Sequence, residues 1–178
     1  AQAAEITAPA EEKQDLPPSL DPAVQPVVTI LWSESDKIQD GEQMPLARAD
    51  ALFKALDDEK QAERIRPDHT GGWYDKTKFR IDFTINGERD NYEGRQDFGD
   101  GDGSLIEHIK AYHEYYRDNE SWKNYVLHND GAEAWEQDVA QREMILNELI
   151  PYFELHRNLY EMEQTAAQAF ESGIELTP

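Results

Sequence analysis

Two short stretches in the first hundred residues have the hydrophobic pattern of β-strands. Residues 27–33 (VVTILWS) are apolar and rich in β-branched side chains, between a proline and a polar segment, which predicts a strand. Residues 79–85 (FRIDFTI) alternate apolar and polar side chains, the period of a half-buried strand. Asn86-Gly87 follows and is a strong signal for a two-residue hairpin turn. We therefore expect residues 91–98 (NYEGRQDF) to form the returning strand.

Helical periodicity begins between these strands. A helix is predicted within residues 41–64, where apolar side chains recur at helical spacing, and Pro45 suits its first turn. The inner stripe of this helix is expected to consist of Leu46, Ala49, Phe53 and Leu56.

From Ser104 onward the pattern is helical almost throughout. Ser104 and Glu107 form a capping box that starts one helix, and Asn119 can cap the next. Two longer amphipathic helices follow, and Pro151 is expected to kink or end the first of them. The last three helices are predicted over residues 119–127, 132–150 and 152–170.

The organisation that follows is α+β: a small antiparallel sheet with one early helix, followed by a C-terminal helical bundle. Residues 1–26 hold five of the nine prolines and no aromatic residue, so they are predicted to be a flexible acidic linker. Residues 27–173 are predicted to form a single domain, and residues 174–178 a tail.

The net charge of the chain restricts the partners that it can bind. The chain of 178 residues has 38 acidic and 17 basic side chains, for a net charge of -21, of which the predicted linker contributes -4. Binding DNA, RNA or an anionic membrane requires clustered Lys and Arg, so this balance argues against such partners and favours a protein with a basic surface. No apolar run reaches the ~20 residues of a membrane span. The absence of cysteine excludes disulfides and thiolate chemistry and fits a cytoplasmic protein.

The densest polar cluster lies within residues 88–102. Its aspartates suggest a calcium loop, but the EF-hand spacing fails, because position six counted from Asp100 is Leu105 where glycine is required. A turn between a strand and a helix is favoured over a metal site, and an acidic loop presented to a basic partner is a third interpretation. The acids selected as partner-binding candidates are Glu88, Asp90, Glu93, Asp97, Asp100 and Asp102.

Aromatic residues supply the other candidates. Those within residues 112–125 lie close together, and most are expected to pack in the core or between helices. Tyr115 falls off the main apolar stripe, and Trp73 and Tyr74 follow a glycine pair in a predicted loop. These three are predicted to be exposed and to bind a protein partner beside the acids.

Motifs of known reactions are absent from the sequence. The five histidines are scattered, HExxH does not occur, and His108 and His113 are expected to face different sides of their helix, at the surface or half-buried. There is no nucleophile elbow, P-loop or dinucleotide fingerprint. We therefore expect no enzyme, no metal site and no cofactor. A metal-dependent hydrolase or nuclease that uses Asp and Glu stays open as a further hypothesis.

Four segments resemble a known family: ILWSES, YDKTKFRIDFTINGE, YEGRQDFGDGDGSLIEHIKAYHEYY and WKNYVL. Together they are similar to the large polyvalent protein-associated domains, which occur in giant proteins of conjugative elements and phages of gut Firmicutes. The resemblance extends over about residues 27–170. It implies a part in the survival of incoming DNA in a new host. For stand-alone relatives it implies anti-defence roles, including anti-CRISPR activity, and it supplies no catalytic residue.

Charge and resemblance together lead to a functional hypothesis. The chain is expected to inhibit a type II CRISPR RNA-guided nuclease by occupying its basic nucleic-acid surface as a DNA mimic. The alternative is a protein-interaction module of a polyvalent protein that has no inhibitory activity. The identity of the partner, the stoichiometry and the oligomeric state stay open.

Overall fold

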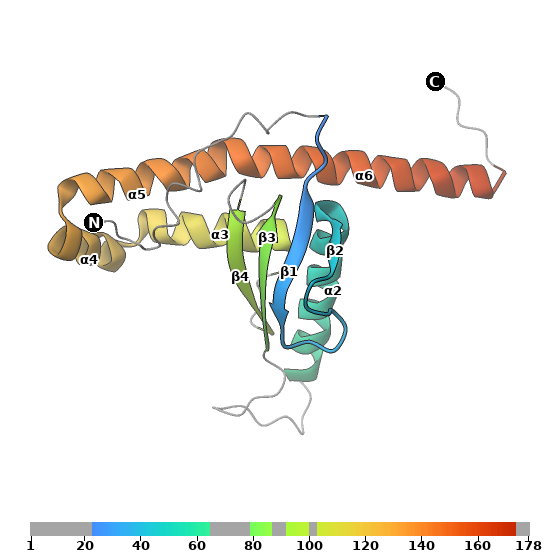
Figure 1. Cartoon of the computed structure of the whole chain (residues 1–178), viewed down its shortest axis with the longest axis horizontal. Coiled ribbons are helices and arrows are strands. Elements are labelled where there is room, and N and C mark those ends of the chain that lie inside the picture. The colour runs from blue at the N-terminus through green and yellow to red at the C-terminus, as the bar shows by residue number, and fades with distance from the viewer. Residues whose placement is uncertain (1–22, 65–78, 87–91, 100–102, 174–178) are drawn as a thin grey trace.

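The computed structural model describes residues 23–64, 79–86, 92–99 and 103–173. Four antiparallel strands form one sheet, and helices cover one of its faces and extend beyond it (Figure 1). In order across the sheet, the strands are β2 (Gln43–Pro45), β1 (Val27–Ser33), β3 (Phe79–Ile85) and β4 (Tyr92–Phe98). The predicted α+β class, with a small antiparallel sheet, one early helix and a C-terminal helical bundle, is confirmed.

Alternation along the strands separates an apolar, buried face of the sheet from a more polar one. Val28 pairs with Ile85, and Ile30 pairs with Phe83, across β1 and β3. All four side chains are fully buried. The opposite face carries charged residues of β3 and β4, and Trp32 on this face is 39% exposed. In the part of the chain that the structure describes, the helices therefore cover the first of the two faces.

The hairpin between β3 and β4 differs from the prediction in its turn. The strands pair antiparallel as expected, but six residues, 86–91, separate their paired ends, so the two-residue Asn86-Gly87 turn is wrong. Asn86 has a positive φ of 59°, and its side-chain oxygen accepts the backbone N–H of Val27 at 2.8 Å. Asn86 thus joins the end of β3 to the start of β1, a long-range contact that local turn rules do not contain.

Helix α2 (Leu46–Arg64) packs on the buried face of the sheet. Its Phe53 makes edge-to-face contacts with Phe83 and Phe98, with ring centroids 5.9 and 5.2 Å apart. Such contacts each contribute about 0.5–1.5 kcal/mol beyond area burial. Pro45 ends the short strand β2 instead of lying in the first helical turn as predicted. The four stripe residues that the periodicity predicts are all buried: Leu46, Ala49, Phe53 and Leu56.

The next two helices begin at the predicted caps. In α3 (Leu105–Asp118), the side chain of Ser104 accepts the N–H of Glu107, and the Glu107 carboxylate accepts the N–H of Ser104, both at 3.2 Å. In α4 (Glu120–Asp130), the side chain of Asn119 accepts a backbone N–H of the first turn at 2.7 Å. These caps satisfy backbone donors that the helix itself leaves unpaired.

The last elements are continuous and form a long rod across the top of the molecule (Figure 1). They are α5 (Ala132–Met144), a π-helical segment η1 (Ile145–Leu149) and α6 (Ile150–Glu171). The chain stays helical through Pro151, which lies in the first turn of α6 and does not end the helix. A proline lacks the N–H and crowds the carbonyl four residues earlier. The wider turn of η1, directly before it, spaces these carbonyls differently and lets the helix continue.

Residues at the end of the predicted linker contact the folded domain. The Tyr152 hydroxyl donates to the Val24 carbonyl at 2.6 Å, and the Leu46 N–H donates to the Pro26 carbonyl at 3.0 Å. Pro26 is buried. The attachment therefore begins a few residues before β1, while residues 1–22 and 174–178 lie outside the described residues.

Candidate functional site: a polar cleft beside strand β4

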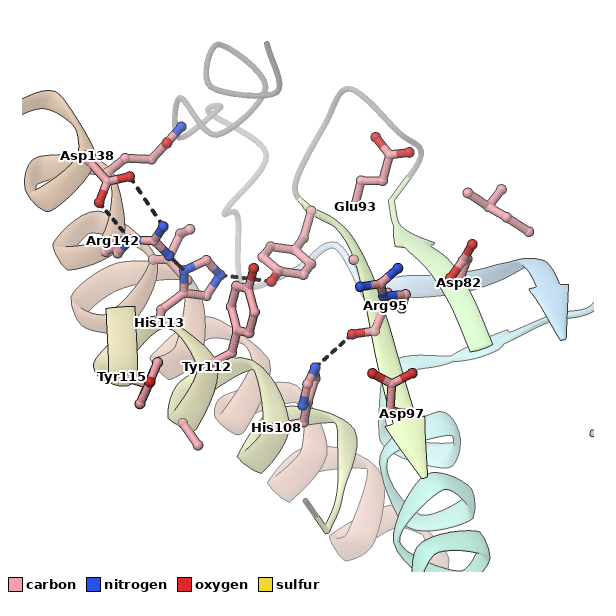
Figure 2. A pocket seen from close by; sticks show the side chains of 16 residues that line it. Asp82, Glu93, Arg95, Asp97, His108, Tyr112, His113, Tyr115, Asp138 and Arg142 are labelled. Carbon is pink, nitrogen blue, oxygen red and sulfur yellow. Dashed lines mark hydrogen bonds and ion pairs between the residues drawn. The ribbon is translucent and has the colours of Figure 1, made fainter. Parts of the chain in front are cut away.

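A cleft of about 810 Å³ lies between β4 and α3, with α5 at its far end (Figure 2). Among the described strands, β4 lies at the edge of the sheet, next to β3. His108 of α3 reaches across the cleft, and its Nε2 donates to the Arg95 carbonyl at 2.8 Å. This contact closes one end of the cleft, which widens from there toward Tyr112 and Glu93 (Figure 2). The volume is in the range of sites that bind small ligands or peptide side chains.

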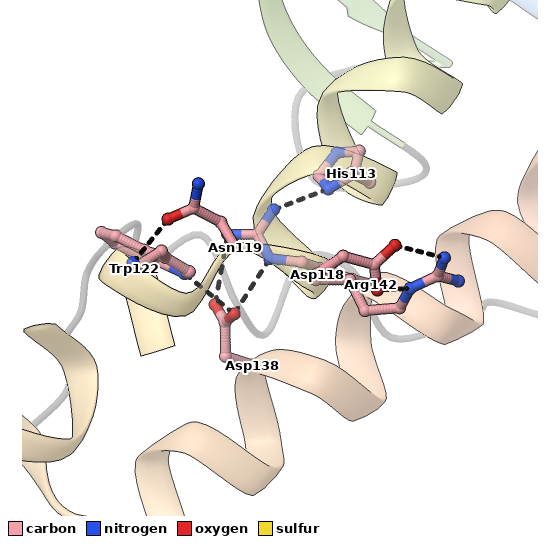
Figure 3. Close-up of polar contacts among 7 residues, drawn as sticks. His113, Asp118, Asn119, Trp122, Asp138 and Arg142 are labelled. Atoms are coloured by element: carbon pink, nitrogen blue, oxygen red, sulfur yellow. Dashed lines mark hydrogen bonds and ion pairs between the residues drawn. The ribbon is translucent and has the colours of Figure 1, made fainter. Parts of the chain in front are cut away.

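Hydrogen bonds run beneath the cleft from β4 to α5. The Tyr92 hydroxyl lies 2.8 Å from His113 Nε2, and His113 Nδ1 lies 2.9 Å from Arg142 Nη1. Arg142 also makes a bidentate ion pair with Asp138 through Nε at 2.9 Å and Nη2 at 3.2 Å. Trp122 Nε1 donates to the same carboxylate at 3.1 Å (Figure 3). The Arg142 and Asp138 side chains are only 11% and 15% exposed, so this network is largely shielded from water.

The direction of each hydrogen bond follows from arginine, which can only donate. His113 Nδ1 therefore accepts, and the neutral ring carries its proton on Nε2, which donates to the Tyr92 oxygen. Burial, reinforced by Arg142 and His108, lowers the pKa of His113 to about 3. Burial also raises the pKa of Tyr92, which stays protonated. Within the described residues, His113 is the only hydrogen-bond partner of the Tyr92 hydroxyl, so the hydroxyl hydrogen has no acceptor among them.

These protonation states define what the cleft can do. Both nitrogens of His113 are engaged, and its low pKa makes the ring a poor general base near neutral pH. The chemistry on offer at the floor is a hydrogen bond from the Tyr92 hydroxyl to a ligand oxygen.

A row of aromatic rings continues from the cleft along α3 and α4. The centroids of Tyr112 and Tyr116 are 4.9 Å apart, and those of Tyr116 and Trp122 are 5.2 Å apart. The Arg142 guanidinium lies 5.1 Å from the Tyr116 ring centroid and 5.9 Å from that of Trp122, within cation–π range. The prediction of packing between helices holds for Tyr116 and Trp122, but Tyr112 and Tyr125 are 44% and 57% exposed.

Comparison with protein families identifies the segment that builds most of this site. The family model for large polyvalent protein associated domain 25 matches residues 21–124, more than half of the chain. The chain belongs to this family. The matched segment contains the whole sheet, α2 and α3, whereas Asp138 and Arg142 lie beyond it. The resemblance expected to reach residue 170 thus ends earlier in the family model.

Neither of the other two comparisons adds a relative. No curated protein and no solved structure matches this polyvalent protein domain. Among the residues that the structure describes, no helix is both long and apolar enough to cross a membrane.

Three of the predicted site residues meet in the cleft of this polyvalent protein domain. Glu93 and Asp97 are exposed on β4, and Tyr115, as predicted, is exposed on α3, with 59% of its surface accessible. All three line the cleft. The other selected residues lie outside the described residues: Glu88, Asp90, Asp100, Asp102, Trp73 and Tyr74.

Two acids that sequence reasoning did not select hold the start of α3. The carboxylate of Asp57, 1% exposed, accepts the N–H of Gly99 at 2.8 Å and of Gly103 at 3.1 Å. Asp50 accepts the N–H of Ile106 in the first turn of α3 at 2.7 Å, and burial raises its pKa. The two acids are seven residues apart on α2, beside its apolar stripe. That spacing is the signal that could have revealed them.

Two of the histidines differ from the prediction in their burial. His113 and His156 are buried, at 8% and 7% exposed, where surface or half-buried positions were expected. His108 and His113 both line the cleft, although they are five residues apart, because β4 lies against one side of α3 and α5 against another. Within the described ranges, no group of three or more metal-ligating side chains is assembled.

Proposed function

We propose that this polyvalent protein domain is an anti-defence module that binds the basic nucleic-acid surface of a type II CRISPR RNA-guided nuclease and inhibits it. The observation that carries the proposal is the excess of exposed carboxylates along the rod of α5, η1 and α6. Residues 132–171 hold nine carboxylates and two arginines. Seven of the nine are exposed: Glu133, Glu136, Glu143, Glu148, Glu161, Glu163 and Glu171.

The charge density of the rod can be compared with that of the DNA duplex that a nuclease binds. A helical rod of this length spans roughly 60 Å at 1.5 Å per residue. A DNA duplex of the same length carries roughly 35 phosphates, at one per 1.7 Å, about five times the net charge of the rod. The rod therefore carries too little charge to replace every phosphate of a DNA duplex with a carboxylate. The rod favours long-range attraction and a faster encounter, and shape-specific contacts supply the remaining affinity.

The proposal includes a binding role without catalysis, in the bacterial cytoplasm where the nuclease acts. It is supported by the buried, doubly hydrogen-bonded state of His113, which leaves this imidazole unsuited to proton transfer near neutral pH. No cofactor is part of the proposal.

Gel filtration of the chain with a purified type II nuclease–guide RNA complex, followed by a DNA-cleavage assay, tests the proposal. We expect co-elution, inhibited cleavage and weaker binding as salt is raised from 50 to 300 mM. Glu143→Gln with Glu148→Gln should weaken binding about fivefold or more. Asp36→Asn with Asp58→Asn, an equal charge change at exposed positions off the rod, is the matched control.

Each outcome has a distinct meaning. Absence of co-elution and of inhibition refutes the proposal. Co-elution without inhibition replaces it by the alternative, a non-inhibitory protein-interaction module. Equal weakening by the two double variants shows that overall charge, and not the rod, determines binding.

A further inference from the structure

The floor of the cleft offers one buried hydrogen-bond donor. Tyr92 is 6% exposed, and its oxygen accepts from His113, so its own hydrogen needs an acceptor. Arg142 fixes this polarity from beneath by donating to the other nitrogen of the His113 ring. A buried donor without an acceptor is unfavourable, so the floor is complementary to a ligand oxygen such as a peptide carbonyl.

The charges that line the cleft exclude some ligands. Four carboxylates and two arginines give a net charge of -2 within a chain of net charge -21. Asp138 and Arg142 pair with each other, and Glu93, Arg95 and Asp97 are exposed at the rim, where the two acids outnumber the one arginine. An anionic ligand is therefore repelled, and a cationic group is attracted to the rim.

The wall opposite β4 is aromatic. Tyr112 and Tyr115 of α3 are 44% and 59% exposed and line the cleft. A guanidinium group stacks on aromatic faces and binds carboxylates with two parallel hydrogen bonds, whereas an ammonium does neither as well. The same chemistry is already used nearby, where Arg142 lies against Tyr116 and Trp122.

One class of ligand combines all three features that the cleft favours. It has a carbonyl oxygen to accept from the floor, a positive charge for the acids of the rim, and a planar group to stack on the aromatic wall. We infer that the cleft between β4 and α3 binds an arginine-bearing peptide segment of a protein partner. The inference deepens the proposed function and rests on it for the partner, since a nuclease with a basic surface exposes such segments. The segment extends from Asp97, beside the His108 contact, toward Tyr112 and Glu93.

Fluorescence anisotropy with a fluorescein-labelled peptide of alternating glycine and arginine tests this inference. Glu93→Gln with Asp97→Asn should weaken binding about tenfold, and Tyr115→Ala about fivefold. The control pair Asp36→Asn with Asp58→Asn removes the same charge away from the cleft and should change affinity less than about twofold. All substituted side chains are exposed, so far-UV circular dichroism should show unchanged folding. A matching glycine–lysine peptide should bind more weakly than the arginine peptide.

Equal weakening by the cleft pair and the control pair overturns the inference, because attraction would then be diffuse. Equal affinity for the arginine and lysine peptides also overturns it. Nuclease binding that is unaffected by the cleft variants removes the cleft as the docking site but leaves the proposed function intact. Peptide binding that depends on the cleft residues, without any nuclease binding by the wild type, supports the cleft and refutes only the proposed function.

Discussion

Replacing Asp57 by alanine tests how the acidic turn before α3 is held in place. The Asp57 carboxylate is almost fully buried on α2 and accepts N–H groups from Gly99 and Gly103. These two glycines stand at the two ends of the turn that joins β4 to α3. The Asp57 side chain therefore helps to fix the distance between the sheet and the helix that form the cleft.

The expected loss follows from the two hydrogen bonds. A hydrogen bond to a charged acceptor contributes about 1.5–3 kcal/mol to stability. The bond to Gly99 is buried and that to Gly103 is part-buried, so the second lies toward the lower end. Asp57→Ala should therefore lower the free energy of unfolding by about 3–5 kcal/mol, a large fraction of the roughly 5–15 kcal/mol of a typical domain.

Urea unfolding followed by tryptophan fluorescence measures this loss. Asp58→Ala is the matched control, because Asp58 is the next residue, is exposed and pairs with Lys54 at the surface. Its cost should stay below about 1 kcal/mol. A loss below about 1 kcal/mol for Asp57→Ala as well would refute the assignment of Asp57 as the residue that holds the turn.

Three further predictions concern the cleft and its supports. The pKa of His113 is 6.5 in the unfolded chain and about 3 in the folded chain. Below pH 6.5 the unfolded chain therefore takes up a proton that the folded chain does not, and the free energy of unfolding falls as the pH is lowered toward 3. Between pH 7 and 5 the wild type should therefore lose about 2 kcal/mol more than His113→Gln, and parallel urea-unfolding curves would contradict this. Gly94→Ala should destabilise by about 1–3 kcal/mol, because a Cβ there would lie 2.5 Å from the Tyr92 ring; thermal unfolding measures it, and an unchanged melting temperature would show that the ring can move aside. Ser104→Ala removes the cap of α3 and should cost about 1 kcal/mol in urea unfolding, whereas no loss would mean that Asp50 alone holds this end of the helix.

The sequence predicts those parts of the fold that are encoded locally. Apolar composition and periodicity predict β1, β3 and most of the helices, β4 is predicted as the strand returning from β3, and the caps at Ser104 and Asn119 follow from residues within one turn. Strand β2 has three residues, too few to show a period, and it exists because β1 pairs with it. The passage of the helix through Pro151 depends on the wider turn before it, which propensity rules do not anticipate.

The site is less predictable because its parts are distant in sequence. Tyr92, His113 and Arg142 come from three elements more than twenty residues apart, and each looks like an ordinary polar or half-buried residue in its own segment. The predicted rim acids Glu93 and Asp97 do line the cleft. Sequence reasoning found them through charge density, but it had no means of finding the donor beneath them.

The division of the cleft between two parts of the chain has a consequence for the polarity of its floor. The tyrosine and the histidine belong to the segment that the family model matches, and Arg142 belongs to a helix beyond it. A carboxylate in place of that arginine would accept from His113 Nδ1 and reverse the tautomer. The unprotonated Nε2 would then accept a hydrogen bond from the Tyr92 hydroxyl, and the cleft would lose its donor. One exchange on a helix outside the matched segment would thus turn a floor that donates into one that accepts, with the sheet and its hydroxyl unchanged.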